Sequence, residues 1–286
     1  MLDFVVVGAQ KSGTTWLYEA FDQHPGIFVP PSKELHYLCP SEECRFSTQR
    51  LGRKWYIDQF QGAKSNQIKG ELTTDYMFYP GTATALSELN TTLKIICCLR
   101  DPIERAHSAY WMKKRHNHRL HGFDTEIRTN SRILERGLYY RQLEPFFNVF
   151  AGKNILVLVF EEFFINPIRS VQEVFKFLEV DETFTVKNLG GKVGSTKVLP
   201  PAIGYFYYKI ASPLLNSKRI LPLWKRVRQF SVVTNIMSLL LNERDNLDEP
   251  RLIDDATRID LYKYYKEDQE KLFELLGRRI DVWDRG

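Results

Sequence analysis

The stretch FVVVGAQKSGTTW, residues 4–16, decides the fold of this chain. A run of β-branched residues stops at Gly8, a second glycine follows at Gly13, and an amphipathic helical pattern begins directly after it. This order is the layout of an anion-binding loop, because unpaired backbone N–H groups and the positive end of the helix dipole meet at a helix N-terminus. The alternative is a plain strand-turn-helix corner with a solvated lysine.

The spacing nearly follows the P-loop pattern G-x-x-x-x-G-K-[ST]. Lys11 lies two residues before Gly13, whereas the pattern has its lysine directly after the second glycine. This departure argues against an ordinary ATP or GTP site. It is compatible with a related phosphate-type site, in which Lys11 supplies a charge and Thr14 and Thr15 supply hydroxyl donors.

Composition and charge describe an ordinary globular chain of 286 residues, with 43% apolar and 26% charged side chains. No apolar run approaches the ~20 residues that span a bilayer, and the first residues already predict a strand. We therefore expect a soluble, cytoplasmic protein, the alternative being a Golgi-luminal domain of a longer chain. The net charge is +5, but residues 183–242 hold nine Lys or Arg and no acid. This basic segment favours an anionic ligand, substrate or surface, unless it is a solvated loop and helix face.

The four cysteines fall into two pairs. Cys97 and Cys98 lie in an apolar strand pattern and are expected to be reduced core residues. Cys39 and Cys44 lie in a loop and could pair in an oxidising compartment. No Cys/His spacing predicts a metal site.

Continuous apolar runs predict buried parallel strands over residues 4–7, 93–99 and 155–160, with a weaker strand over 68–72. Helical patterns fall between them and after them: 14–23, 50–62, 82–90, from 102, 137–150, from 167, and 254–276. The last helix has Ile259, Tyr262, Leu272 and Leu276 as its expected buried stripe, and Ile168 begins that of the helix from 167. Alternation of strands and helices from 4 to 180 argues for a doubly wound α/β domain.

The second strong strand ends in Arg100-Asp101-Pro102. Asp is a favoured N-cap and Pro a favoured first helical residue, so a helix is expected to start at once. Ligands of open α/β sheets bind outside the carboxyl ends of the strands, where Arg100 lies. With Ser108 two helical turns further on, Arg100 would form a phosphate clamp. The alternatives are a surface ion pair for Arg100 and a helix-surface hydroxyl for Ser108.

Two other stretches are dense in polar chemistry. Residues 32–37, SKELHY, bring a base, an acid and an imidazole together, unless they form an exposed charged turn. Residues 112–121 contain seven Lys, Arg or His, which would guide an acidic acceptor or form a solvated helix end.

Three features together resemble the sulfotransferases that use 3′-phosphoadenosine 5′-phosphosulfate (PAPS). Residues 10–16 are similar to the family's 5′-phosphosulfate loop, whose lysine has this shifted position. CLRDPIERAHS at 98–108 resembles the 3′-phosphate motif, and 33–36 resembles the base loop of heparan-sulfate-type members. VFEEF at 159–163, followed by Asn166-Pro167, is similar to a later strand signature, so the resemblance covers about 4 to 180.

The resemblance implies a P-loop-NTPase-like α/β fold, a doubly wound and mostly parallel sheet of about five strands with helices on both faces. It implies one sulfotransferase domain over 1–286. Residues 1–182 would form the PAPS-binding core, 183–253 a basic, aromatic-rich cover and acceptor region, and 254–286 the C-terminal helix.

The resemblance also implies a role for each matching residue. Glu34 would be the general base, and Lys11 would stabilise charge on the leaving phosphate. The implied donor-binding residues are Lys11, Ser12, Gly13, Thr14, Thr15, Trp16 (against the adenine), Arg100 and Ser108 (at the 3′-phosphate) and a late lysine, Lys192 or Lys197. The chain departs from the family pattern at Glu71, where phenol-type members have histidine, at Leu72, where heparan-type members have lysine, and at Phe160, where many have tyrosine. Glu71 and His36 stay open as alternative bases.

The implied reaction moves a sulfuryl group from PAPS to an acceptor hydroxyl, on a glycan or a lipid-linked alcohol, and releases PAP. It involves no metal and no nucleic acid, and residues 205–228 are a candidate for peripheral membrane contact. One rival is a P-loop kinase or NTPase with Glu161 at a strand end as its Mg²⁺ ligand. The other is a non-catalytic nucleotide- or membrane-binding module. The acceptor and the oligomeric state are left open by the sequence.

Overall fold

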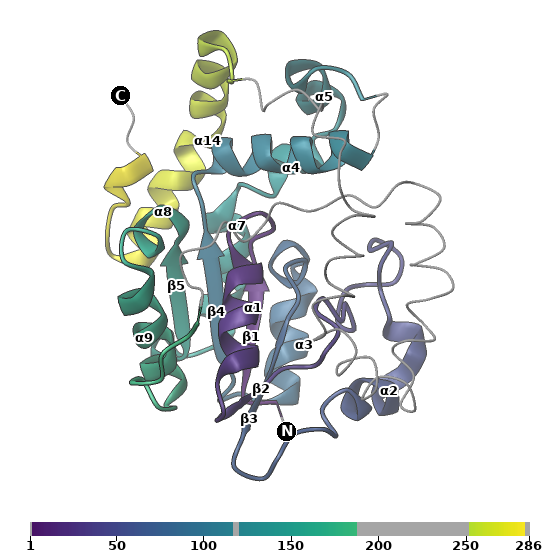
Figure 1. Ribbon diagram of the computed structural model, residues 1–286. Helices are drawn as coiled ribbons and strands as arrows, with labels where there is room; N and C mark the ends of the chain where they lie inside the picture. Colours follow the sequence, from purple (N-terminus) through teal and green to yellow (C-terminus); the bar gives the residue numbers. More distant parts are fainter. Residues whose placement is uncertain (1, 117–119, 188–251, 284–286) are drawn as a thin grey trace, which may run out of the picture. The chain divides into compact units, whose positions relative to one another are not determined.

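The computed structural model describes residues 2–116, 120–187 and 252–283 (Figure 1). Its centre is a five-stranded parallel sheet in the order β2-β3-β1-β4-β5. The strands are β1 (Phe4–Gly8), β2 (Ile27–Phe28), β3 (Ile68–Leu72), β4 (Lys94–Leu99) and β5 (Ile155–Val159). The first strand lies in the middle, which explains its continuous apolar pattern, because both of its faces are covered.

Helices cover both faces of the sheet, as a doubly wound fold requires (Figure 1). Phe4 and Val6 face the apolar side chains of α1 (Thr14–Gln23) and α9 (Pro167–Leu178). Val5 and Val7 face those of α3 (Gly81–Leu89), α7 (Tyr139–Val149) and α14 (Asp255–Leu276). The remaining helices are α2 (Gly52–Asp58), α4 (Pro102–His116), α5 (Phe123–Thr129), α6 (Arg132–Glu135) and α8 (Phe160–Phe163). The 3₁₀ turns are η1 (Gln49–Leu51), η2 (Tyr76–Phe78), η3 (Gly152–Asn154) and η5 (Asp281–Trp283).

The predicted start of α4 is confirmed in detail. Pro102 is its first residue, and Asp101 Oδ1 accepts the N–H groups of Ile103 at 2.8 Å and Glu104 at 3.1 Å. The carboxylate therefore satisfies two of the backbone donors that a helix start leaves without partners. This cap fixes the turn that directly follows Arg100.

The predicted apolar stripe of α14 is wrong in its first half, because Ile259 and Tyr262 are exposed. Leu261 and Tyr265 are buried instead, against the side chains of Ile103 and Ile133. Further along, Leu272 and Phe273 join the sheet-side core. Periodicity gave one stripe, but the helix packs against two different partners on two of its faces. A similar correction applies to Ile168, which is exposed at the start of α9.

The chain forms two compact units. The first consists of Met1–Tyr110, His121–Val193 and Ile253–Gly286 and contains the sheet, and the second consists of Trp111–Leu120 and Gly194–Leu252. The candidate site described below belongs to the first unit. Among the described residues, no helix is both long and apolar enough to cross a membrane. Lys192, Lys197, residues 205–228 and most of the predicted basic cover over 183–253 lie outside the described residues.

Candidate active site

The loop after β1 carries the features expected of an anion site. The Ala9 N–H donates to the Cys98 carbonyl at 2.7 Å, which ties the loop to β4. Gly13 has a φ of 86°, in the left-handed region that favours glycine, and caps α1 without a side chain. A Cβ added there would lie 3.0 Å from the Phe160 ring. No side chain caps the start of α1, and a helix N-terminus of this kind suits an anion that approaches the loop.

Arg100 lies over this loop. Its Nη1 donates to the Lys11 carbonyl at 3.4 Å, and its Cζ is 4.7 Å from the centre of the Phe160 ring. Its Nε is buried and has no hydrogen-bond partner among the described residues. The Tyr139 hydroxyl donates to the Arg100 carbonyl at 2.7 Å and so fixes the backbone. A buried guanidinium N–H without a partner fits a site that takes up an anion.

Ser108, the second member of the predicted clamp, is half-buried on α4. It lies six residues into the helix, which is about 9 Å along the axis. The structure thus puts Arg100 at the strand end and Ser108 on the helix that follows, as the sequence predicts.

Lys33 reaches the same loop from another segment. Its Nζ donates to the hydroxyls of Thr14 at 3.2 Å and Thr15 at 3.0 Å. The ammonium group also lies 3.7 Å from Glu34 Oε1. Burial lowers the pKa of Lys33, and the negative charge of Glu34 opposes that change. A second lysine, which lies outside the motif of residues 10–16, therefore stands at the N-terminus of α1 beside the loop of Lys11.

Glu34 is held at the carboxyl end of β3. Its N–H donates to the Leu72 carbonyl at 2.9 Å, and its Oε2 accepts the Thr74 N–H at 2.8 Å. The Thr74 hydroxyl lies 3.2 and 3.1 Å from the two carboxylate oxygens. The backbone of Glu34 has a φ of 64°, and 28% of its side chain is exposed. This carboxylate is fixed by neighbours and still open to solvent on one side.

The two alternative bases have different surroundings. Glu71 is buried beneath the site, where Tyr56 and Tyr76 donate to Oε1 and Thr73 donates to Oε2. Burial raises the pKa of Glu71 to about 7, although the three hydroxyl donors oppose the shift. His36 turns its Nδ1 toward Asp75 Oδ2, 3.4 Å away. Glu34 is the most exposed of the three groups.

Aromatic side chains flank the loop of Lys11. Trp16 is buried, with its ring 4.7 Å from Phe163 and 5.6 Å from Phe164 between centres. A small pocket beside it is lined by Ser12, Gly13, Leu17, Cys98, Leu158, Phe160, Phe163 and Phe164. The predicted contact of Trp16 with adenine stays a prediction. The indole packs edge-on against Phe163 and Phe164, and of these three rings only that of Phe164 is exposed.

Sequence reasoning missed several residues of the site. Thr74, which holds Glu34, lies in a polar run without a motif, and Tyr139, which holds the Arg100 carbonyl, is 39 residues away from it in the chain.

Glu161 uses Oε1 to accept the Asp101 N–H and Oε2 to accept the Trp283 Nε1–H, both at 3.0 Å. Because both oxygens are engaged, Glu161 braces the strand end and is poorly suited to bind Mg²⁺.

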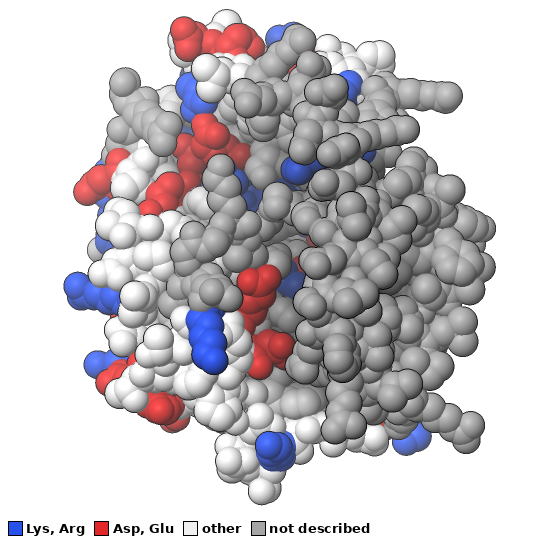
Figure 2. All heavy atoms as spheres, in the orientation of Figure 1, with Lys and Arg blue, Asp and Glu red and all other residues white. Residues whose placement is uncertain are grey.

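The described surface carries charges of both signs. Figure 2 shows acidic and basic side chains on the same face. Several form exposed ion pairs, such as Arg278 with Glu162 at 2.9 Å and Arg279 with Glu270 at 2.9 Å. The acid-free segment of the sequence lies almost wholly outside this described surface.

Comparison with known proteins gives matches to sulfotransferases. A model of the sulfotransferase domain matches residues 2–189. Over 142 residues the chain is 31% identical to the membrane-associated sulfotransferase kil1 of Dictyostelium discoideum, which covers 46% of this chain and 29% of that protein. Over 197 residues it is 24% identical to human heparan sulfate glucosamine 3-O-sulfotransferase 5, which covers 65% of this chain and 55% of that protein. The chain thus spans about half or less of the length of these relatives.

The fold is shared with a solved structure. The crystal structure of a sulfotransferase from Alicyclobacillus acidocaldarius aligns with a TM-score of 0.74 over 100% of this chain and 99% of that one, at 22% identity. This likeness shows a shared fold, in agreement with the P-loop-NTPase-like α/β fold that the resemblance implies. The domain match covers well over half of the sequence and includes both predicted motifs, so the chain belongs to the sulfotransferase-domain family.

Proposed function

We propose that this chain transfers a sulfuryl group from PAPS to a hydroxyl group of an acceptor and releases PAP. The observation that carries the proposal is that two cations meet at the start of α1 and the loop before it, with a carboxylate beside them. Lys33 contacts the hydroxyls at the start of α1, Arg100 contacts the Lys11 carbonyl in the loop, and Glu34 lies beside Lys33. Cations and N–H donors for an anion stand there beside one carboxylate. This combination suits group transfer between an anionic donor and a neutral alcohol.

The donor would lie along the loop and the end of β4. Lys11, Ser12, Gly13, Thr14 and Thr15 would hold the phosphosulfate, and Arg100 with Ser108 would hold the 3′-phosphate. The buried, unpartnered Nε of Arg100 supports this assignment, since an anion would satisfy it. Lys192 is the proposed completing lysine.

In the proposed reaction the acceptor oxygen attacks sulfur while the bond between sulfur and the 5′-phosphate oxygen breaks. The hydroxyl proton passes to Glu34, and such a base typically contributes about 10²–10⁴-fold in rate. Negative charge develops on the leaving phosphate oxygen, where Lys11 and the ammonium group of Lys33 would stabilise it. A hydrogen bond to a charged group is worth about 1.5–3 kcal/mol, and pre-positioned donors strengthen as charge develops.

The proposed acceptor is an alcohol of a glycan or of a lipid-linked carrier. A carboxylate base in place of the histidine of phenol-type members supports an alcohol over a phenol. The glucosamine 3-O-sulfotransferase named among the relatives supports a glycan.

Two measurements test the proposal together. Calorimetry should give stoichiometric binding of PAP and none of ATP with Mg²⁺, and radiolabelled PAPS should pass its label to a member of a panel of glycans, lipid alcohols and phenols. Lys11→Met should abolish label transfer, whereas Lys64→Met, which changes an exposed lysine outside the site, should not. Binding of ATP with Mg²⁺ would favour a kinase or NTPase instead. PAP binding without transfer to any acceptor would favour a non-catalytic module.

A further inference from the structure

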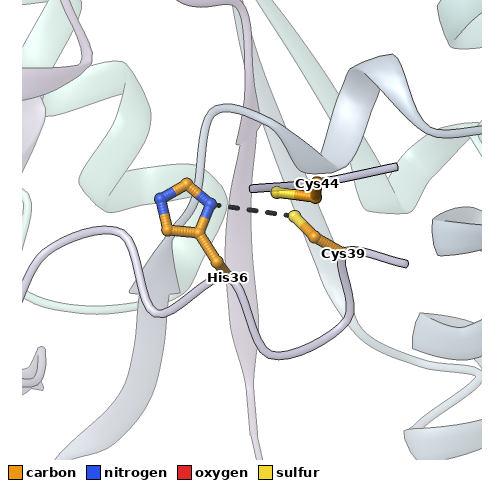
Figure 3. Close-up of side chains that lie close together, drawn as sticks. All are labelled: His36, Cys39 and Cys44. Atoms are coloured by element: carbon orange, nitrogen blue, oxygen red, sulfur yellow. Dashed lines mark hydrogen bonds between the residues drawn. The ribbon is translucent and has the colours of Figure 1, made fainter. Parts of the chain in front are cut away.

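Three side chains of the kinds that bind metal ions lie close together in the segment that follows Glu34 (Figure 3). The Nδ1 of His36 and the Sγ atoms of Cys39 and Cys44 all lie within 4.8 Å of one another. Figure 3 shows the imidazole directed at the two sulfurs, with 3.7 Å between Nδ1 and the Sγ of Cys39. Both cysteines are buried free thiols.

A carboxylate from the segment after β3 lies beside this cluster. Asp75 Oδ2 lies 3.4 Å from His36 Nδ1. Tetrahedral Zn²⁺ binds sulfur at about 2.3 Å and nitrogen or oxygen at about 2.0–2.2 Å, so it holds nitrogen and sulfur ligands about 3.6 Å apart and nitrogen and oxygen ligands about 3.4 Å apart. The two distances measured here from His36 match those two edges of the tetrahedron. The His36 imidazole therefore already lies at suitable distances from one thiol and from the carboxylate.

We propose that His36, Cys39, Cys44 and Asp75 form a structural zinc site. A closed set of four protein ligands, two of them thiolates, is typical of structural zinc. Arg136 would orient the carboxylate from outside, since its Nη1 lies 2.6 Å from Asp75 Oδ1. The buried charges would cancel, because Zn²⁺ and the guanidinium balance two thiolates and one carboxylate.

The rival arrangement is a disulfide between the two thiols. The structure favours the metal, because both cysteines are free thiols and the His36 Nδ1 lies 3.7 Å from the Cys39 sulfur. An entering Zn²⁺ displaces the thiol protons and replaces their charge. The sequence alone does not predict this site, because H-x-x-C-x₄-C has no fourth ligand nearby in the chain. Only the fold brings Asp75 next to His36.

Zinc at this place would hold the loop that presents Glu34. His36 follows Glu34 by two residues, and both have positive φ, 52° and 64°. The loop is otherwise held by a few hydrogen bonds, such as that from the Thr48 hydroxyl to the Leu35 carbonyl at 2.7 Å. This consequence for Glu34 rests on the proposed function. The metal site itself does not.

The test is the metal content of the full chain purified without chelator. Elemental analysis should find about one zinc per chain, falling at least tenfold in Cys39→Ser and in Cys44→Ser. The matched control is Cys97→Ser, a buried cysteine of β4 outside the cluster, which should keep its zinc. Because a buried substitution can prevent folding, the wild-type protein is also exchanged with Co²⁺, and a thiolate-to-cobalt absorption band is expected.

Absence of both bound zinc and the cobalt band overturns the site. So does a disulfide between Cys39 and Cys44, detected by mass spectrometry after alkylation of free thiols. If zinc is present but label transfer from PAPS fails, the metal site stands and the proposed function is overturned.

Discussion

Glu34 and Glu71 are neighbours in the fold, but their surroundings give them different chemistry. Glu34 receives donors from Thr74 and remains partly exposed beside Lys33. Glu71 is enclosed by three hydroxyl groups and water does not reach it. When environment separates two carboxyl groups in this way, they can serve different roles at one pH. The exposed one suits proton transfer with an acceptor, and the buried one suits support of the strand end.

At this scale we expect Glu34→Gln to lower turnover by about 10²–10⁴-fold, because the amide cannot take the acceptor proton. The PAP dissociation constant should stay within a few-fold of wild type, since the substitution leaves the loop of residues 9–13 intact. Steady-state transfer of label and calorimetry with PAP measure the two quantities. Glu42→Gln, on an exposed residue of the same segment, is the control. Wild-type turnover in Glu34→Gln would move the base to Glu71 or His36.

The raised pKa of Glu71 also predicts how stability depends on pH. Folding shifts this pKa from 4.5 to about 7, so the folded state prefers the protonated carboxyl. The resulting stabilisation is present below about pH 4.5 and is lost as the pH rises through about 7. Between about pH 5 and about pH 8, the free energy of unfolding of wild type should fall by at most about 3 kcal/mol relative to that of Glu71→Gln. Urea unfolding at the two pH values measures this difference. The control Glu88→Gln, at an exposed residue, should show the same pH dependence of the free energy of unfolding as wild type. A constant difference between wild type and Glu71→Gln at both pH values would refute the titration.

At the scale of elements, the junction of β1, its loop and α1 depends on backbone conformation. Lys11 and Gly13 both have positive φ, 71° and 86°. The loop can turn its N–H groups toward one point only with these conformations, and the Phe160 ring closes on it from α8. A side chain at position 13 would strain the backbone and displace that ring.

Gly13→Ala should therefore cost about 1–2 kcal/mol of stability and weaken PAP binding about tenfold or more. Thermal unfolding and calorimetry with PAP measure both. Gly81→Ala is the matched control, because the first residue of α3 has open space for a Cβ and an ordinary φ. That variant should be unchanged or more stable by up to about 1 kcal/mol. Equal behaviour of the two variants would contradict the assigned role of Gly13.

At the scale of the whole first unit, the C-terminal segment braces the site. Trp283 is buried against Tyr139 and Phe273, and its Nε1–H donates to Glu161. Glu161 in turn accepts the Asp101 N–H next to Arg100. Residues far apart in the sequence thus hold the turn between β4 and α4.

Trp283→Ala should destabilise the fold by about 3–5 kcal/mol, the usual cost of removing a large buried aromatic side chain. Urea unfolding measures the loss. Val282→Ala changes the preceding, partly exposed residue and should stay within about 0.5 kcal/mol of wild type. A loss below about 1 kcal/mol for Trp283→Ala would show that the C-terminal segment is not part of the cooperative unit.

Local patterns predicted the elements closely, since α1 occupies Thr14–Gln23 and β3 occupies Ile68–Leu72, as expected. The expected helix over 50–62 is shorter in the structure, ending at Asp58. Burial on α14 was mispredicted because periodicity identifies an apolar face without saying which partner will cover it. The cluster of His36, Cys39, Cys44 and Asp75 was not predicted for a related reason, because no local spacing in the sequence joins all of its members.

The sequence by itself determined the parallel α/β fold, the strand-loop-helix of residues 4–16 and the position of Arg100 at the end of β4. These rest on local backbone chemistry: β-branched runs, two glycines, and an Asp-Pro helix start. Only the tertiary structure decided that Lys33 joins Thr14 and Thr15, that Thr74 holds Glu34, and that Trp283 braces the strand end. Such contacts depend on how distant segments pack, because side-chain hydrogen bonds form wherever the completed sheet brings donors and acceptors within about 3 Å.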